Sequence, residues 1–331
     1  MFRNKVIAIT GGTGSFGKAC IPKILKKNPK EIRIFSRDEM KQWEMVNLYK
    51  NNNKVKFFIG DVRDINSLNN VFSGVDYVIH AAATKIVPTA EYNPEECLKT
   101  NVLGAINVIQ SAKLNKIKKL VALSTDKASN PINLYGASKL CSDKLIIASN
   151  FTNNKNKISF SVVRYGNVIS SRGSVIPFFL EKEKDGFFPI TDLRMTRFMI
   201  SLEEGVKLVW KAFEDMTGGE IYVKKIPSMK ITDIANAINP KIEKRIVGIR
   251  PGEKLHEQMI GFEDSAYTYE YNSYYKIFPS IHNWSTDPSR IRDGKKVSDN
   301  FIYSSDTNPD WMSIENFQNW LTKNHSLVGK Y

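Results

Sequence analysis

A glycine-rich turn directly after the first apolar run constrains the fold of this chain most. Residues 5–10, KVIAIT, read as a buried strand, and the next residues place Gly11, Gly14 and Gly17 in G-x-x-G-x-x-G spacing before a helical pattern. In this strand–turn–helix context the glycines permit a tight turn, a close approach of backbone to a pyrophosphate and close helix–sheet packing. Free N–H groups at the helix N-terminus complete the predicted phosphate site. Further N–H or hydroxyl contacts are expected from Thr13, Ser15 and Phe16.

Five apolar runs in the first half read as buried strands separated by amphipathic helical patterns. They lie at residues 5–10, 32–36, 55–60, 76–82 and 118–125. Because the runs are almost continuously apolar, they suit a parallel sheet that helices cover on both faces. The alternation predicts an α/β fold with a doubly wound parallel (Rossmann) sheet.

The second half is less regular and predicts a smaller, interleaved C-terminal substrate-binding domain. Its clearest elements are a strand at 158–168 and a helix at 201–216 that a serine cap opens, whereas the tail from about residue 263 has no regular pattern. Because no linker separates the halves, the second domain is expected to be woven back onto the first. The expected cofactor domain is 1–168, with a return near 195–220, and the mainly substrate-binding domain is 169–331.

Composition argues against several classes of function. No apolar run approaches the roughly 20 residues that a membrane span needs, and the basic start is followed by too few apolar residues for a secretory signal. The formal net charge is +14, but the lysines are dispersed. This disfavours nucleic-acid binding and is compatible with an anionic small substrate. Three scattered cysteines indicate reduced thiols in a cytoplasmic protein, and four histidines show no metal-ligand spacing.

The end of the second strand distinguishes NAD from NADP. Arg37 comes first after that strand, and Lys41 can reach the same 2′-phosphate one helical turn later, which favours NADP. Asp38 is the residue that the ribose of NAD would use, so NAD stays open. After the third strand, Asp61 and Val62 are placed to contact the edge of the adenine ring.

Tyr135 and Lys139 lie four residues apart on a predicted helix and therefore share one face. A free tyrosine has a pKa near 10, but a neighbouring ammonium and a cationic nicotinamide favour the phenolate. After a glycine motif and a strand that ends in Thr125, this spacing predicts hydride-transfer chemistry. Lys139 would hold the nicotinamide ribose, and the Thr125 hydroxyl can bind the alcohol that is oxidised.

Asp126 and Lys127 form a second ionisable couple, which oxidation alone does not need. They follow the fifth strand at its carboxyl end, where open α/β sheets place active sites. Once C4 of a hexose is a ketone, the C5 proton becomes acidic, and expulsion of the C6 hydroxyl needs both a base and an acid. The couple therefore predicts elimination of water, with a surface ion pair as the alternative.

These motifs resemble the extended short-chain dehydrogenase/reductases, and within them the inverting UDP-N-acetylglucosamine 4,6-dehydratase family of pseudaminic acid biosynthesis. The resemblance runs nearly end to end, through TGGTGSFGK, FIGDVRD, LSTDKA, RYGNV, GIRPGEK and YSSD. Retaining sugar 4,6-dehydratases typically carry Thr-Asp-Glu at the end of the fifth strand. Here the residues are Thr125, Asp126 and Lys127, and the lysine is what the inverting family shows.

The resemblance implies a catalytic cycle. Tyr135 would take the C4 hydroxyl proton as hydride passes to a tightly bound NADP, which is regenerated within the cycle. Lys127 would remove the C5 proton while Asp126 protonates the departing C6 hydroxyl. Hydride would then return to C6, and C5 would be protonated on the opposite face. The implied product is UDP-2-acetamido-2,6-dideoxy-β-L-arabino-hexos-4-ulose, a precursor of surface glycans.

The resemblance also implies binding residues and a homo-oligomer, for which a hexamer is one expected form. Further cofactor contacts are implied for Ala81, Lys85 and Val168. Contacts to the UDP-sugar are implied for Lys85, Asn167, Arg172, Thr191, Arg250 and Glu253. The family usually has Lys-His-Val-Pro where this chain has Ile86 after Lys85, a departure that concerns loop detail or fine specificity.

Two other functions fit parts of the sequence. A UDP-hexose 4-epimerase would need Tyr135 and Lys139 but would leave Asp126 and Lys127 unexplained. A non-catalytic, NADP-sensing protein predicts loss of the Tyr/Lys pair, which this chain retains. The dehydratase is therefore the favoured hypothesis.

Overall fold

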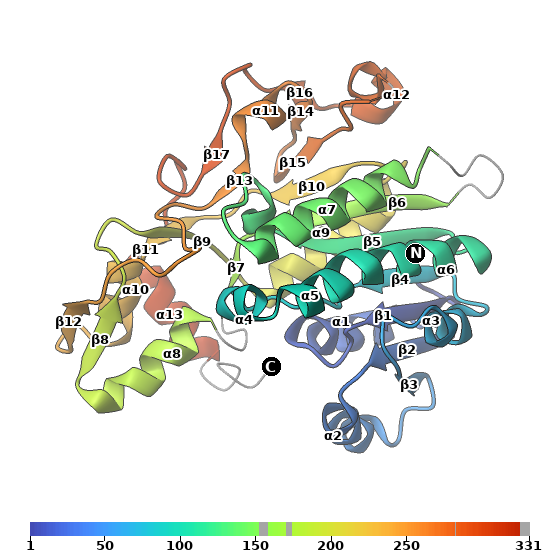
Figure 1. The fold of residues 1–331 in the computed structure, drawn as a ribbon, viewed down its shortest axis with the longest axis horizontal. Coiled ribbons are helices and arrows are strands. Elements are labelled where there is room, and N and C mark those ends of the chain that lie inside the picture. Colours follow the sequence, from blue (N-terminus) through green and yellow to red (C-terminus); the bar gives the residue numbers. More distant parts are fainter. Residues whose placement is uncertain (152–157, 170–173, 282, 325–331) are drawn as a thin grey trace.

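The computed structural model of the chain describes residues 1–151, 158–169, 174–281 and 283–324. Its centre is a ten-stranded sheet in the order β16-β14-β15-β10-β6-β5-β4-β1-β2-β3 (Figure 1). The seven strands from β10 to β3 run parallel, which confirms the predicted doubly wound sheet. Their bounds are β1 Val6–Thr10, β2 Glu31–Ser36, β3 Val55–Ile59, β4 Tyr77–His80, β5 Lys119–Thr125, β6 Ser159–Tyr165 and β10 Ile221–Lys224.

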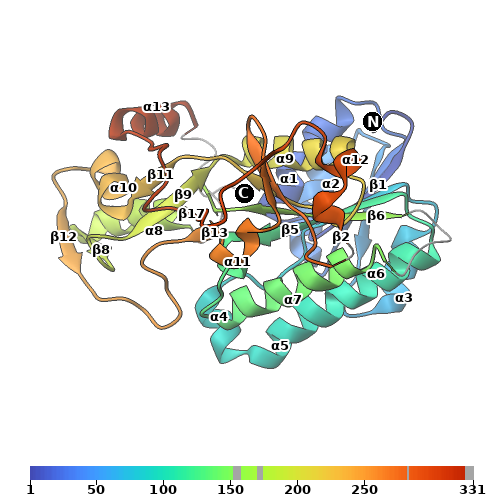
Figure 2. The same ribbon diagram turned by 90° about the horizontal axis from the view of Figure 1, so that it is seen from above.

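Helices cover both faces of this sheet because the central strands carry buried side chains on each face (Figure 2). On one face lie α3 (Ile65–Phe72), α6 (Gly104–Leu114) and α7 (Leu134–Ala148). On the other lie α1 (Ser15–Leu25) and α9 (Leu202–Asp215), whose first turn is capped by the Ser201 hydroxyl, which accepts the Glu204 N–H at 3.2 Å. Helix α2 (Glu39–Tyr49) follows β2.

Short helices surround the carboxyl ends of the parallel strands. After β4 come α4 (Val87–Tyr92), α5 (Pro94–Leu98) and a π-helix, η1 (Lys99–Leu103), which leads into α6. A 3₁₀ turn, η2 (Asp126–Ala128), follows β5 directly. No helix within the described ranges combines the length and apolar character needed to cross a membrane.

A second, smaller apolar core lies to one side of the large sheet, and we call this part the small lobe (Figure 1). Its strands form a β11-β9-β7 sheet and a β12-β8 pair. Their bounds are β7 Asn167–Val168, β8 Phe187–Ile190, β9 Thr196–Ile200, β11 Ser228–Lys230 and β12 Glu243–Ile246. The helices around it are α8 (Val175–Lys182), the 3₁₀ turn η3 (Glu183–Asp185), α10 (Ile231–Ile238) and α13 (Ile314–Asn324).

The chain passes repeatedly between the two lobes, since α9 and β10 of the large sheet separate β9 from β11. The segment after residue 263 is also more regular than expected. Strands β14 (Thr268–Glu270), β15 (Tyr274–Ile277) and β16 (Lys295–Lys296) add an antiparallel edge to the large sheet. These strands are too short to leave a legible period in the sequence. The domain boundary at residue 168 stays a prediction.

Five further short elements complete the described C-terminal part. Strands β13 (Gln258–Ile260) and β17 (Tyr303–Ser304) pair with each other between the lobes. Helices α11 (Phe262–Ser265) and α12 (Pro288–Ile291), with the 3₁₀ turn η4 (Trp284–Thr286), accompany the antiparallel edge.

A buried ionic cluster joins that edge to α9. Lys276 on β15 is buried and its Nζ lies 2.6 Å from Asp215 Oδ2, at the end of α9. Asp215 also accepts hydrogen bonds from the Tyr222 hydroxyl and from Arg292, each at 2.8 Å. The Lys276 ammonium further lies 4.5 Å from the ring centre of Tyr271. A buried lysine of this kind is tolerated only while its carboxylate partner is present.

Replacing Asp215 with Ala is therefore expected to lower the free energy of unfolding by about 3–5 kcal/mol, because Lys276 is left as an unpaired buried charge. Urea denaturation measures the effect. The neighbouring Glu214→Ala change, at an exposed position, serves as the control and is expected to be nearly neutral. Equal stability of the two variants would contradict the assigned role of the cluster.

Candidate active site

The predicted functional residues gather at the carboxyl edge of the parallel strands. Strands β1, β2, β4, β5 and β6 all end at this edge because they run in the same direction. In open α/β sheets, ligands bind outside this edge.

The glycine turn after β1 has the shape of a phosphate cradle. Gly11 has a φ of +66°, and a Cβ there would lie 2.7 Å from the Ala82 nitrogen, so only glycine fits. Gly14 directly precedes α1, whose first turn contains Ser15, Phe16 and Gly17. The Thr13 hydroxyl lies 2.7 Å from that of Ser36 at the end of β2. The turn and the free N–H groups of α1 fit the pyrophosphate of a dinucleotide.

The charged residues at the end of β2 differ in how they are engaged. Asp38 caps α2 by accepting the Lys41 N–H at 2.9 Å, and it also pairs with the Lys41 ammonium. Arg37 is half exposed and reaches Asp61 only at 3.5 Å. The Asp38 carboxylate is therefore engaged within its own helix, whereas the Arg37 guanidinium remains accessible.

The loop after β3 is held by a residue that sequence reasoning missed. Asn107 on α6 donates hydrogen bonds to the carbonyls of Val62 and Arg63, at 3.1 and 2.9 Å. Val62 is buried, and Arg63 also donates to the Asp61 carboxylate. Burial alone would raise the pKa of Asp61, but hydrogen bonds from Arg63 lower it.

The loop after β4 is fixed by the π-helix. Asn101 of η1 accepts the Thr84 N–H at 2.8 Å and donates to the Thr84 carbonyl at 2.9 Å. Ala81 directly follows β4 and lies against the Gly11 turn. Lys85, which follows Thr84, is at an exposed position of the loop. Ile86, where the family usually has histidine, is 55% exposed.

Tyr135 and Lys139 lie one turn apart on α7, as predicted. Asn133 caps this helix by accepting the Gly136 N–H at 2.7 Å and also donates to the Gly252 carbonyl at 2.8 Å. A Cβ at Gly136 would lie 2.2 Å from the Lys127 carbonyl oxygen, so glycine lets α7 rest directly on η2.

The electrostatics of Tyr135 differ from expectation. Burial raises the pKa of Tyr135 to about 12, and within the chain the largest opposing effect comes from Lys127 rather than Lys139. Burial lowers the pKa of Lys139, and Asp143, one turn further along α7, partly reverses this. Asp143 in turn accepts the Ser124 hydroxyl at 2.6 Å. The chain alone therefore does not activate the phenol.

Thr125, Asp126 and Lys127 form a contiguous polar contact. The Thr125 hydroxyl donates to Asp126 Oδ1 at 2.9 Å, and Lys127 Nζ donates to the same oxygen at 3.2 Å. Asp126 is 1% exposed, and burial raises its pKa, although Lys127 opposes the shift. A surface ion pair, the alternative, would leave both partners exposed, whereas the Asp126 carboxylate is buried and Lys127 is half-buried.

Glu257 is a third member of this group, and sequence reasoning missed it. Its Oε1 lies 2.9 Å from Lys127 Nζ, and the side chain is almost wholly buried. Burial alone would lower the pKa of Lys127, but Asp126 and Glu257 outweigh it and raise the pKa. Glu257 lies in the HE pair that follows the GIRPGEK motif, but sequence carries no signal that it meets Lys127.

Four of the residues expected to bind substrate lie in strands of the small lobe or in the loops that follow them. Asn167 begins β7, beside Val168, and Thr191 is buried after β8. Arg250 pairs with Glu253 at 3.0 Å in the loop before β13. Arg172 lies outside the described residues.

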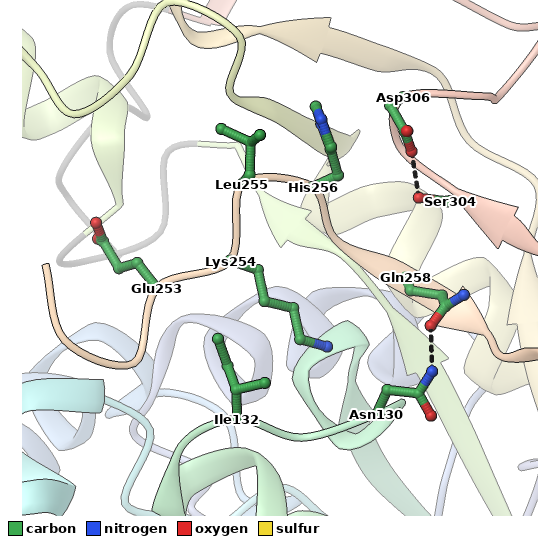
Figure 3. A pocket seen from close by; sticks show the side chains of 9 residues that line it. All are labelled: Asn130, Ile132, Glu253, Lys254, Leu255, His256, Gln258, Ser304 and Asp306. Carbon is green, nitrogen blue, oxygen red and sulfur yellow. Dashed lines mark hydrogen bonds between the residues drawn. The ribbon is translucent and has the colours of Figure 1, made fainter. Parts of the chain in front are cut away.

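An open pocket of about 500 Å³ lies beside this loop (Figure 3). Residues 253–256 form one wall, and Asn130, which donates to Gln258 at 2.6 Å, forms part of the opposite side. Lys254 extends between these walls and donates to the Ser129 carbonyl at 2.6 Å.

Four buried oxygens of this region have no hydrogen-bond partner among the described residues. They are Asp126 Oδ2, Asn167 Oδ1, Glu253 Oε2 and Glu257 Oε2. Because buried polar atoms are normally hydrogen-bonded, these acceptors fit a ligand that is rich in hydroxyl groups. The described part of the chain contains no group of three or more His, Cys, Asp or Glu arranged for a metal ion.

The doubly wound sheet, the glycine turn before α1 and the Tyr-x-x-x-Lys pair on α7 together define an extended short-chain dehydrogenase/reductase. The chain matches the family described as Polysaccharide biosynthesis protein over residues 7–279, and it belongs to that family. It is 56% identical, over 95% of its length and 96% of the relative's, to UDP-N-acetylglucosamine 4,6-dehydratase (inverting) of Campylobacter jejuni subsp. jejuni serotype O:23/36 (strain 81-176). A protein named UDP-glucose 4-epimerase from Rickettsia bellii (strain RML369-C) is 48% identical over 84% of both chains.

Solved structures agree with this assignment. Pen from Bacillus thuringiensis is 32% identical and gives a TM-score of 0.90 over 99% of both chains. DesIV, a dTDP-glucose 4,6-dehydratase from Streptomyces venezuelae with NAD and TYD bound, gives a TM-score of 0.68 at 21% identity, covering 76% of this chain and 86% of its own. DesIV shows the shared fold alone. The predicted fold and family are thus confirmed.

Replacing Gly136 with Ala is expected to lower the free energy of unfolding by about 1–3 kcal/mol, because the new methyl group meets the Lys127 carbonyl. Chemical denaturation measures this change. The matched control is Gly205→Ala on α9, where a Cβ would make only an ordinary 3.6 Å contact with Phe16. That variant is expected to be as stable as the wild type or up to about 1 kcal/mol more stable. Wild-type stability of Gly136→Ala would contradict the close packing of α7 on η2.

Proposed function

We propose that the protein is an inverting, NADP-dependent UDP-N-acetylglucosamine 4,6-dehydratase, a lyase that removes water across C5 and C6 of the sugar. The observation that carries this proposal is the buried contact between Asp126 and Lys127 at the end of β5, beside the helix of Tyr135. An acid and a base in direct contact are what elimination needs and what redox chemistry at C4 alone does not need. The name of the Campylobacter relative supports the substrate. The product would be a 6-deoxy-4-keto sugar for pseudaminic acid or related surface glycans.

The redox half of the reaction depends on Tyr135, Lys139 and Thr125. A bound nicotinamide would supply the acceptor for the C4 hydride and the donor of the hydride to C6. Tyr135 takes the proton of the C4 hydroxyl, and Lys127 together with Thr125 favours its phenolate against the effect of burial on the pKa. Lys139 holds the nicotinamide ribose. Its ammonium is buried, and the nearby Asp143 carboxylate partly offsets the lowering of its pKa by burial.

The elimination half depends on one proton within the Asp126–Lys127 pair. The ion pair and the combination of a carboxylic acid with a neutral amine contain the same number of protons, so a transfer across the 3.2 Å contact interconverts them. Lys127 as the amine takes the C5 proton, and the C5–H electron pair becomes the C5–C6 double bond. The C6–O bond breaks, and Asp126 gives its proton to the departing hydroxyl to form water. The pair is then an ion pair again, and the reverse transfer resets it.

The residues at the end of β2 support NADP over NAD. Asp38, which would bind the ribose hydroxyl of NAD, is already the cap of α2 and the partner of Lys41. Arg37 is half exposed next to it and suits a 2′-phosphate. We expect the turn from Gly11 to Gly17 to hold the pyrophosphate, and Asp61 and Val62 to edge the adenine. Ala81, Lys85 and Val168 complete the proposed cofactor site.

The proposed substrate site lies between the lobes. Its members are Lys85, Asn167, Thr191, Arg250 and Glu253, and the family resemblance adds Arg172, which lies outside the described residues. We also infer a homo-oligomer, and the exposed apolar side chains of Ile86, Tyr92, Leu98 and Leu103 offer one candidate contact face.

A UDP-hexose 4-epimerase is the second candidate, and the name of the Rickettsia relative favours it. Epimerisation at C4 would use Tyr135 and Lys139 and would leave all oxygens in place. It gives no role to a buried acid–base pair at the end of β5, which is the reason for preferring the dehydratase.

In D₂O the purified protein is expected to convert UDP-N-acetylglucosamine, without added cofactor, to a 6-deoxy-4-keto sugar with deuterium at an inverted C5. The deuterium comes from solvent because Lys127 removes the original C5 proton. Mass spectrometry and NMR of the product measure both features. A product that is only a C4 epimer with its C6 hydroxyl retained would establish the epimerase instead.

The Lys127→Ala variant identifies the base in the same experiment. Water loss is expected to fall by about 10²–10⁴-fold, as is typical for loss of a general base. A partial oxidation at C4 should remain, slower than in the wild type because Lys127 also favours the Tyr135 phenolate, and it is visible as the near-ultraviolet absorbance of reduced nicotinamide. Lys144→Ala, at an exposed position on α7, is the control. An unchanged rate of water loss in Lys127→Ala would remove this residue from the mechanism.

The Arg37→Ala variant is expected to bind NADP⁺ about 10–100-fold more weakly, because a charged hydrogen bond to the 2′-phosphate is lost. Affinity for NAD⁺ should stay the same. Calorimetry with cofactor-stripped protein measures both, and Lys56→Ala on the neighbouring strand controls for the loss of one positive charge. An equal loss of affinity for NADP⁺ and NAD⁺ would show that Arg37 does not bind the 2′-phosphate.

A further inference from the structure

We propose that Glu257 is a positioning residue that holds the amine of Lys127 in place and strengthens it as the base for the C5 proton. This inference rests on the proposed dehydratase function and adds a residue to its elimination step. Glu257 is 1% exposed, and its Oε1 lies 2.9 Å from Lys127 Nζ. It is therefore a closer partner of the lysine than Asp126, at 3.2 Å.

The backbone of Glu257 is fixed by the strand pair β13–β17. Its N–H donates to the Ser305 hydroxyl at 2.9 Å, and its carbonyl accepts the Ser305 N–H at 2.8 Å. The Ser305 hydroxyl in turn lies 2.7 Å from that of Thr196 on β9. These hydrogen bonds fix the Glu257 backbone, so its carboxylate is held beside the Lys127 ammonium.

Arg197 on β9 keeps the Glu257 carboxylate ionised. Its Nε lies 3.7 Å from Glu257 Oε1, and its guanidinium donates to the carbonyls of Thr196, Lys254 and Leu255. Burial alone would raise the pKa of Glu257, but Lys127 and then Arg197 lower it. Because burial raises the pKa of Asp126 whereas that of Glu257 is lowered, we assign the proton of the acid–amine state to Asp126 and the role of acceptor to Glu257.

The two carboxylates therefore have different tasks. When Asp126 is protonated, it no longer compensates a charge on Lys127, and Glu257 is the remaining acceptor for the amine hydrogens. A hydrogen bond to Glu257 fixes the direction of the amine lone pair. As Lys127 takes the C5 proton, the new ammonium forms 2.9 Å from a negative charge, which favours the transfer. Without Glu257 the lysine would be both less oriented and less basic.

The test compares Glu257→Gln with the wild-type holoenzyme over a range of pH. The reactive acid–amine state and the ion pair hold the same number of protons, whereas one further proton leaves Lys127 as an ammonium beside a protonated Asp126, so deuterium incorporation at C5 falls as pH drops through the pKa of the pair. Removing a negative charge at this distance lowers that pKa, and the acidic limb is expected to move to lower pH by about one unit. The maximal rate of C5 exchange should fall about 10–100-fold because the amine is misplaced. The KM and the single-turnover rate of C4 oxidation should not change.

Two further variants separate charge from position. Glu257→Asp keeps the charge but withdraws it by one methylene, so the rate is expected to fall while the pH limb stays in place. Glu263→Gln, at an exposed position nearby, is the control for the loss of one carboxylate. If Glu257→Gln does not fold by circular dichroism, the rate loss in Glu257→Asp, with KM and C4 oxidation retained, decides the question.

The inference would be overturned if the acidic limb of the pH profile of Glu257→Gln did not move, or if C4 oxidation and C5 exchange were lost equally. Glu257 would then have only a structural role. These outcomes are distinct from failure of the proposed function. In that case the wild type would form no 6-deoxy-4-keto sugar at all.

Discussion

The contact of the half-buried Lys127 ammonium with two buried carboxylates, Asp126 and Glu257, is the interaction on which the rest of the site depends. A buried charge is costly unless partners compensate it, so each member of the group constrains the others. Asp126 and Lys127 both lie in η2, directly after β5, whereas Glu257 comes from the loop before β13 and Arg197 from β9 of the small lobe. The same ionic contacts that prepare the elimination therefore also join the two lobes.

The parallel sheet supplies the other half of this arrangement. Because β1, β2, β4, β5 and β6 end at one edge, the phosphate cradle and the polar end of β5 meet without any long excursion of the chain. Helix α7 then carries Tyr135 against η2 through the close contact at Gly136. In the proposed mechanism, redox and elimination chemistry share one site because Asp126 and Lys127 of η2 and the first turns of α7 are packed together.

The sequence sufficed for the features that local pattern encodes. The strands of the first half, the glycine turn, the helix of Tyr135 and Lys139, and the ionisable couple after β5 all follow from periodicity and spacing. Glu257 could not be found in this way, since its meeting with Lys127 is a long-range contact without any period. Strands β14 to β16 were missed because segments of two to four residues leave no alternation to recognise. The activation of Tyr135 was attributed to Lys139, but three-dimensional proximity makes Lys127 the larger influence.

The double use of the Asn133 side chain has a mechanical consequence. Its oxygen caps the helix that carries Tyr135, and its nitrogen is bonded to the Gly252 carbonyl in the loop of Arg250 and Glu253. A displacement of that loop therefore pulls on the first turn of α7 or breaks its cap. The position of the Arg250–Glu253 loop and the position of the Tyr135 phenol are therefore linked through Asn133, and a ligand that fixes the loop also fixes the phenol.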